Sequence, residues 1–223
     1  MPGYYSEKLS AERLRRVYEI ATPRISRYLE SEIKYVVDRI EPGDSVIELG
    51  CGYGRVLKNL NRAAKSVIGI DSSQSSVEMA REYLADVSNC HLFAMDAAAL
   101  GFRDRLFDVV ACIQNGISAF KVNPHDLVAE CVRVARPGGR ILLSSYSERF
   151  WEDRLEWFEH QAKEGLLGEI DYDTTGDGVI VCKDGFRATT FSSDDFQSLA
   201  AELRLNCTIE EVDESSLFCE IIV

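Results

Sequence analysis

The sequence predicts one α/β domain over residues 1–223, built on a doubly wound, mostly parallel sheet with an antiparallel C-terminal strand. From residue 45 to residue 146, short apolar runs alternate with segments of helical periodicity. Continuously apolar strands with helices between them are typical of a parallel sheet that is covered on both faces. Three glycines directly follow the first apolar run, where sheets of this kind approach a ligand.

The elements before and within this sheet can be placed by periodicity and by capping residues. Apolar stripes predict two helices before residue 41, and we expect residues 1–40 to form a helical lid. The predicted strands are SVIEL, SVIGI, CHLFAM, FDVVACI and ILLSS, in that order. Between them we expect a helix through Leu60, one near 75–86 that begins with a capping box of Ser75 and Glu78, and one near 124–135 capped by Asn123.

After the fifth strand the pattern changes. Residues 148–190 predict an aromatic-rich helix and a hairpin that turns at Lys183-Asp184-Gly185, which we interpret as an elaboration on the substrate side. A helix capped by Ser192 and two final strands, near 207–212 and 217–223, complete the expected domain.

Composition limits the classes of function. The chain has 25 basic and 37 acidic side chains, a net charge of −12, which disfavours a protein that grips nucleic acid through its phosphates. No apolar run has the length of a signal peptide or a membrane span. Seven dispersed cysteines without a Cys-x-x-Cys pair are typical of reduced core thiols, and three separated histidines predict no metal site. We therefore expect a cytoplasmic monomer or homodimer.

The glycine loop indicates what kind of ligand is bound. A dinucleotide loop has the spacing G-x-G-x-x-G, but here Arg55 takes the place of the third glycine. Glu48 stands just before the loop, and a carboxylate there is a poor neighbour for a pyrophosphate and a good one for an ammonium group. These two residues speak against a nicotinamide-dependent oxidoreductase, which stays an alternative on this sheet.

The stretch ELGCGYGR resembles the first motif, E/D-x-G-x-G-x-G, of the class I S-adenosylmethionine-dependent methyltransferases. The likeness continues in order through VIGID, FAMDAAAL, FDVVACIQNG and ARPGGRILLSS. It implies a Rossmann-like fold and S-adenosyl-L-methionine as the cofactor.

The resemblance also implies which residues bind that cofactor. Glu48, Gly50, Cys51 and Gly52 would meet its methionine part, Asp71 its ribose hydroxyls, Ser72, Asp96 and Ala97 its adenine, and Gln114 would lie near the sulfonium. Taken singly, Asp71 is better explained as a helix cap and Asp96 as a turn acid, and it is their occurrence together with Glu48 that favours the cofactor roles.

The segment CIQNGISAF, after the predicted fourth strand, is expected to face the methyl acceptor and therefore indicates which class of acceptor is bound. It lacks the Asn/Asp-Pro-Pro-aromatic run of enzymes that methylate base amino groups, and it resembles locally the corresponding stretch of glycine and other small-amine N-methyltransferases. We predict that Asn115 orients the acceptor as the catalytic residue, the alternative being that its side chain only braces the turn.

Candidate acceptor-binding residues come from the two elaborations. They are Tyr5, Tyr146, Trp151 and Arg154. For Trp151 the competing explanation is a packed helical face shared with Leu155 and Phe158.

The leading hypothesis is therefore an enzyme that methylates a small molecule on nitrogen, oxygen or sulfur. Besides the oxidoreductase, a non-catalytic cofactor-binding partner subunit stays open, and so does a protein acceptor.

Overall fold

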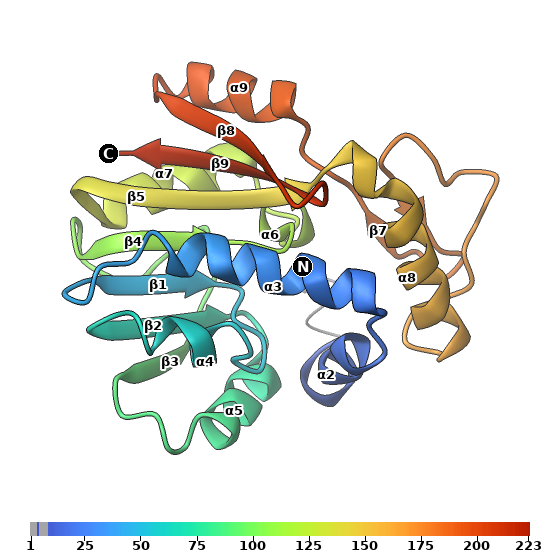
Figure 1. Ribbon diagram of the computed structural model, residues 1–223, viewed down its shortest axis with the longest axis horizontal. Coiled ribbons are helices and arrows are strands. Elements are labelled where there is room, and N and C mark those ends of the chain that lie inside the picture. Colours follow the sequence, from blue (N-terminus) through green and yellow to red (C-terminus); the bar gives the residue numbers. More distant parts are fainter. Residues whose placement is uncertain (1–3, 5–8) are drawn as a thin grey trace.

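The computed structural model describes Tyr4 and residues 9–223, and its centre is a seven-stranded sheet of order β3-β2-β1-β4-β5-β9-β8 (Figure 1). The strands are β1 (Ser45–Leu49), β2 (Ser66–Asp71), β3 (Cys90–Ala94), β4 (Phe107–Cys112), β5 (Ala135–Tyr146), β8 (Cys207–Val212) and β9 (Ser216–Ile222). Strands β1 to β5 pair in parallel, whereas β9 is antiparallel to both of its neighbours. The predicted fold class is confirmed.

Helices cover both faces of the sheet because each presents one apolar stripe. On one face lie α3 (Pro23–Val37), α4 (Leu57–Leu60) and α5 (Gln74–Tyr83); on the other lie α7 (Pro124–Val134) and α9 (Ser193–Glu202). The strands between them supply fully buried aliphatic side chains to two separate cores, as expected for a doubly wound sheet.

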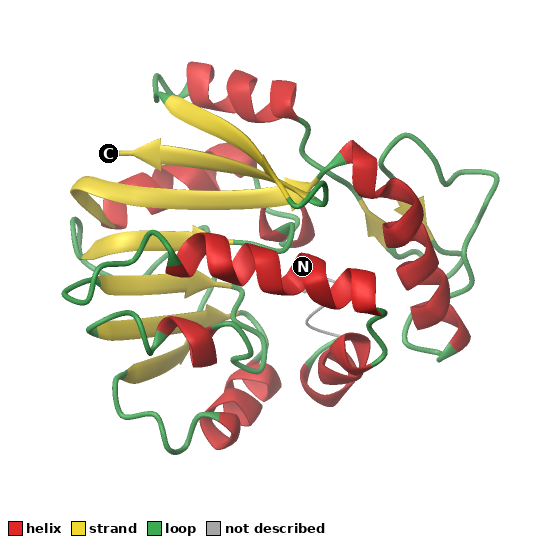
Figure 2. Cartoon of the chain, in the orientation of Figure 1, coloured by secondary structure: helices red, strands yellow, loops and turns green. Residues whose placement is uncertain are grey.

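A third layer gathers at the carboxyl ends of the parallel strands, where Figure 2 shows helices and a small hairpin beside the main sheet. It contains α2 (Ala11–Glu19), α6 (Gly116–Ala119), the 3-10 turn η1 (Glu148–Phe150), α8 (Trp151–Lys163), and the hairpin strands β6 (Ile180–Val181) and β7 (Arg187–Ala188). An aromatic-rich core holds most of this layer together. The predicted helix and hairpin elaboration is therefore present, with Gly185 at its turn in a left-handed conformation (φ +94°).

Side chains set the helix ends, and one prediction about them is wrong. Asn123 and Ser192 cap α7 and α9 as expected. Helix α5 is capped by Ser73, which accepts from the Ser76 amide, and not by a capping box that begins at Ser75. No helix in the described part of the chain is long and apolar enough to cross a membrane; the longest, α3, has 15 residues.

Candidate functional site

A cavity of about 520 Å³ lies at the carboxyl edge of the sheet, where α2 and α8 also contribute to its wall. Its volume is within the usual range of small-molecule sites. The ends of β1, β2, β3, β4 and β5 all contribute to its wall. Eight residues predicted from the sequence line it: Glu48, Gly50, Asp71, Ser72, Asp96, Ala97, Gln114 and Tyr146. Segments far apart in the sequence therefore meet where the parallel strands end.

The glycine loop is held tightly against the neighbouring strand. The amides of Gly50 and Cys51 both donate to the carbonyl of Ile70, each at 2.8 Å. Gly50 has a φ of +76°, and a Cβ atom there would come within 2.5 Å of the Phe120 ring. Both the conformation and the close approach require glycine at this position.

Asp71 ends β2 and is half-buried in the cavity wall. Its two carboxylate oxygens accept from the amides of Gly52 (2.9 Å) and Ser73 (2.8 Å). The acid therefore ties the glycine loop to the start of α5. Each oxygen keeps the capacity to accept a further hydrogen bond, so Asp71 can also receive the hydroxyl groups of a ligand.

Glu48 is the buried acid of the site. It is 3% exposed, and its Oε2 atom has no hydrogen-bond partner among the described residues. Burial raises the pKa of Glu48 to about 8, although the positive charge of Arg55 opposes this rise. A cation beside the carboxyl group would stabilise its ionised form.

Gln114 occupies the turn after β4 in a left-handed conformation (φ +55°). Its backbone amide donates to Glu32 Oε2 at 2.7 Å and to Ser144 Oγ at 2.9 Å, while its side-chain oxygen accepts from the Tyr18 hydroxyl at 3.1 Å. The side-chain nitrogen Nε2 is buried without a partner among the described residues. A donor in the cavity wall is therefore free for a ligand.

Glu32 was not among the predicted site residues, although one of its carboxylate oxygens accepts from the backbone amide of Gln114 in the cavity wall. This α3 side chain is completely buried, and its second oxygen accepts from Ser216 Oγ at 2.7 Å. Burial raises the pKa of Glu32 to about 7. The sequence does contain a signal for Glu32, because it places this carboxylate within the apolar stripe of a predicted helix.

Two other predicted cofactor residues, Cys51 and Gly52, are not among the residues that line the cavity. The Cys51 side chain lies beside Gly69 of β2, and Cys51 does not line the cavity. Gly52 lies under Leu14 of α2, and its amide is taken by Asp71. Any role of these two residues is therefore through the backbone of the loop.

Of the predicted acceptor residues that the structure describes, only Tyr146 lines the cavity. Arg154 is 1% exposed, lies 4.4 Å from the Tyr146 ring centre, and donates to the Gly178 carbonyl. Trp151 packs beside the aromatic-rich core with Leu155 and Phe158, as the packed-face explanation expects. Tyr5 lies outside the described residues.

Most of the cavity's aromatic wall was missed from the sequence. We call it the aromatic chamber; its members are Tyr18, Tyr28, Tyr146, Trp157 and Phe158. The ring of Tyr28 lies 5.5 Å from that of Tyr146 and 6.5 Å from that of Trp157. Helical spacing predicts Tyr28 as a core residue, but only the packing of three helices shows that its ring faces a cavity.

Asn115 lies beside the cavity and is not part of its wall. The side chain is 5% exposed, donates to the Thr189 carbonyl at 2.8 Å and accepts from Ser145 Oγ at 2.9 Å. Ser145 Oγ also accepts from the amide of Phe191. Both ends of the Asn115 amide thus join β5 to the segment after β7, which favours the bracing explanation; its catalytic role stays a prediction.

We expect the variant Asn115→Ala to lower the free energy of unfolding by about 1–3 kcal/mol, because buried hydrogen-bonding partners would lose their contacts. Affinity for S-adenosylhomocysteine should stay within about twofold. Urea unfolding and calorimetry on one preparation measure both quantities. Unchanged stability together with a loss of turnover would instead assign Asn115 to the acceptor.

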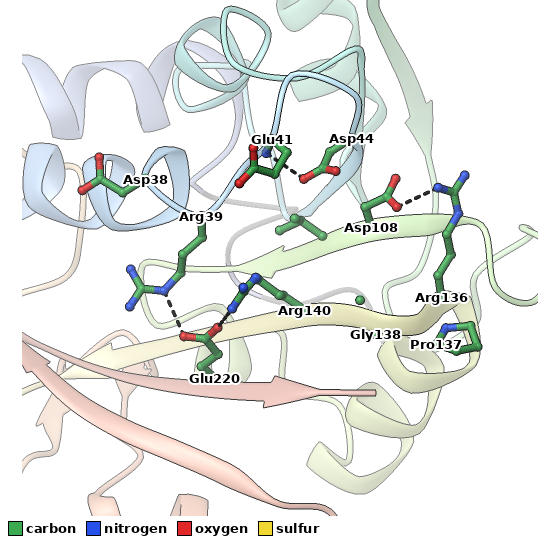
Figure 3. A pocket seen from close by; sticks show the side chains of 12 residues that line it. Asp38, Arg39, Glu41, Asp44, Asp108, Arg136, Pro137, Gly138, Arg140 and Glu220 are labelled. Carbon is green, nitrogen blue, oxygen red and sulfur yellow. Dashed lines mark hydrogen bonds and ion pairs between the residues drawn. The ribbon is translucent and has the colours of Figure 1, made fainter.

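A second cavity, of about 530 Å³, lies at the opposite edge of the sheet, where the parallel strands begin (Figure 3). Its three arginines pair with acids of the same cavity: Arg136 donates to Asp108, and Arg39 and Arg140 both donate to Glu220. None of the buried, unpartnered polar atoms of the described residues belongs to this cavity. Because its three arginines are already paired with its own acids, we assign the ligand site to the carboxyl edge.

Comparison with known proteins finds a family match within the chain. Residues 46–139 match the family described as "Methyltransferase domain". The chain is similar to an "Uncharacterized 37.1 kDa protein in transposon TN4556" of Streptomyces fradiae (32% identity over 57% of this chain and 41% of that protein). It is also similar to the ubiquinone biosynthesis O-methyltransferase of Aromatoleum aromaticum (30% identity over 48% of this chain and 46% of that protein). The chain thus spans about half the length of the curated relatives it matches.

Among solved structures, the fold is similar to that of a SAM-dependent methyltransferase from Aquifex aeolicus. The TM-score is 0.65 at 14% identity, and the match covers 94% of this chain and 97% of that chain. At this identity the likeness concerns the fold.

The residues of the cavity fit S-adenosylmethionine by their chemistry. The unpartnered acid Glu48 suits an ammonium group, the carboxylate of Asp71 suits a pair of hydroxyl groups, and the glycine loop admits a close ligand. Residues 46–139 thus match a methyltransferase domain, the fold is similar to that of SAM-dependent methyltransferases, and the cavity residues fit S-adenosylmethionine as the cofactor.

Proposed function

We propose that this protein transfers a methyl group from S-adenosylmethionine to a small-molecule acceptor that binds in the aromatic chamber. The observation that carries the proposal is the chamber itself, in which aromatic side chains from α2, α3, β5 and α8 surround the space beside Gln114. All of these residues lie outside the matched segment 46–139. Such a wall favours an enzyme with its own acceptor site over a non-catalytic cofactor-binding subunit.

We assign the cofactor contacts as follows. Glu48 and the backbone of Gly50 and Gly52 hold the methionine part, with Cys51 in the same loop; Asp71 accepts from the ribose; Ser72, Asp96 and Ala97 surround the adenine; Gln114 lies near the sulfur. When bound, the cofactor supplies a methyl group on positively charged sulfur. The protein holds the acceptor in line and excludes water.

The chamber favours a flat acceptor. Aromatic side chains pack well against a planar ring, and one relative acts in ubiquinone biosynthesis as an O-methyltransferase. The Tyr28 hydroxyl is buried and has no partner among the described residues. Burial raises the pKa of Tyr28 well above its ordinary value, so this hydroxyl donates a hydrogen bond that orients the acceptor and does not remove a proton.

The test is a methyl-transfer assay with a panel of phenols, thiols and small amines, read by mass spectrometry as S-adenosylhomocysteine and a methylated product. We expect turnover with planar, hydroxylated rings and a loss of turnover in the variant Tyr28→Phe, with cofactor affinity retained. Methylation of small amines only would support the likeness of the segment after β4 to amine N-methyltransferases and contradict the flat-ring acceptor. Methylation of added protein alone would contradict the proposal as a whole.

A further inference from the structure

One polar side chain in the wall of the cavity has no partner within the protein. Gln161 of α8 lines the cavity and is 2% exposed. Its side-chain amide makes no hydrogen bond with another described residue, and only its backbone carbonyl is engaged, by the amide of Leu166. Burying an amide without a hydrogen bond is unfavourable, so such a group is usually explained by a ligand or a water.

Helix α8 gives the Gln161 side chain a fixed place beside the aromatic chamber. Trp157, Phe158 and Gln161 are spaced by three and four residues, so they share one face of the helix, and all three line the cavity. Gln161 lies about 6 Å further along the helix axis than Trp157. The end of the helix is held, because the Gln161 carbonyl accepts from the Leu166 amide at 2.9 Å and Arg13 of α2 donates to the Leu166 carbonyl at 2.9 Å.

The walls around the Gln161 amide carry no charge. Among the described residues, those that α2, α3, β5 and α8 contribute to the cavity are all uncharged, and apart from Gln161 they are aromatic or aliphatic. The charged residues of the cavity come from other segments, and they are Glu48, Asp71, Asp96 and Lys121. A charged group of a ligand would find no partner beside Gln161, whereas a neutral hydrogen-bonding group would.

We propose that Gln161 determines which acceptor is methylated, by binding a second polar group of the acceptor, a neutral hydroxyl or carbonyl away from the atom that receives the methyl group. This inference rests on the function proposed above and adds a specificity-determining residue to its acceptor site. A primary amide both donates and accepts, so it suits either group. A flat acceptor that lacks the second group would leave the amide unpaired and would be a poorer substrate.

The competing explanation is that the Gln161 amide stabilises the fold through a bridging water. The variant Gln161→Met separates the two explanations, because methionine is unbranched like glutamine but has only a weak acceptor and no donor in its side chain. If the amide serves the acceptor, the variant should keep or raise the melting temperature of the ligand-free protein, since an unpaired polar group is removed. If the amide serves the fold, the melting temperature should fall.

The experiment is the methyl-transfer assay with two pairs of phenols of nearly the same shape: 4-(hydroxymethyl)phenol with 4-ethylphenol, and 3-(hydroxymethyl)phenol with 3-ethylphenol. Only the first member of each pair has a second polar group, and all four are neutral at neutral pH. We expect the wild-type chain to methylate the hydroxymethyl compound of at least one pair with a kcat/KM about tenfold or more above that of its ethyl partner. The two pairs differ in where they place the second group relative to the ring hydroxyl.

In Gln161→Met this preference should vanish, while kcat/KM for the ethyl compound stays within about threefold of the wild-type value. Gln197→Met, the same substitution at an exposed position of α9, is the matched control and should keep the preference. Methylation without a preference in either pair, or a preference that survives in Gln161→Met, would overturn this inference alone. Loss of the preference together with a lower melting temperature would assign the amide to the fold and also overturn it. No methylation of any of the four phenols would refute the planar, hydroxylated acceptor proposed above, and this inference with it.

Discussion

Replacing Asp71 with alanine should weaken the binding of S-adenosylhomocysteine by about 2–4 kcal/mol, because two charge-assisted hydrogen bonds to the ribose would be lost. The structure adds a second effect. Asp71 also accepts from the amides of Gly52 and Ser73, so the ligand-free variant should lose about 1–3 kcal/mol of unfolding free energy. Calorimetry and urea unfolding measure the two effects separately.

The variant Asp86→Ala is the matched control, because Asp86 is an exposed acid after α5. It should change neither affinity nor stability. A folded Asp71→Ala variant with wild-type affinity would show that Asp71 only ties the loop to α5 and does not touch the cofactor.

The free energy of unfolding should fall as the pH rises from about 5 to about 8, because two buried carboxyl groups have raised pKa values. Burial raises the pKa of Glu32 to about 7 and that of Glu48 to about 8, from an ordinary value of 4.5. Between the ordinary and the raised pKa, the folded state binds more protons than the unfolded state, so raising the pH favours unfolding. The limiting slope is about 1.4 kcal/mol per pH unit for each group.

Urea unfolding at several pH values measures this slope in the ligand-free protein. Glu32→Gln and Glu48→Gln should each flatten it, Glu32→Gln up to about pH 7 and Glu48→Gln up to about pH 8. Glu82→Gln, at an exposed position of α5, should leave it unchanged. Stability that stays constant or rises over this range would mean that the two carboxyl groups are ionised in the folded protein.

Much of the fold was predictable because short stretches of the sequence indicate where its strands and helices lie. Apolar runs define the parallel strands, and Asn123 and Ser192 mark helix starts by hydrogen bonds to amides within three residues. The cap of α5 was misplaced because Ser73 and Ser75 lie two residues apart at the start of the helix, and only the backbone geometry shows that Ser73 is the cap and Ser75 is already helical.

The candidate site was predictable where a short motif carries it and not where packing creates it. Glu48, Gly50 and Asp71 follow from the strand ends and line the cavity as expected. The sequence places Asn115 equally near, but its side chain turns to Thr189, a contact 74 residues away. The positions of Tyr28 and Trp157 in the cavity wall depend on how α3 and α8 meet, which no local pattern records.

The most direct test of the account is a crystal structure of this protein with S-adenosylhomocysteine. We expect the ligand in the cavity at the carboxyl edge, with its ribose on Asp71, its ammonium group on Glu48 and its sulfur facing the aromatic chamber. A ligand in the groove lined by Arg39 and Glu220, or one whose sulfur faces away from the chamber, would contradict it.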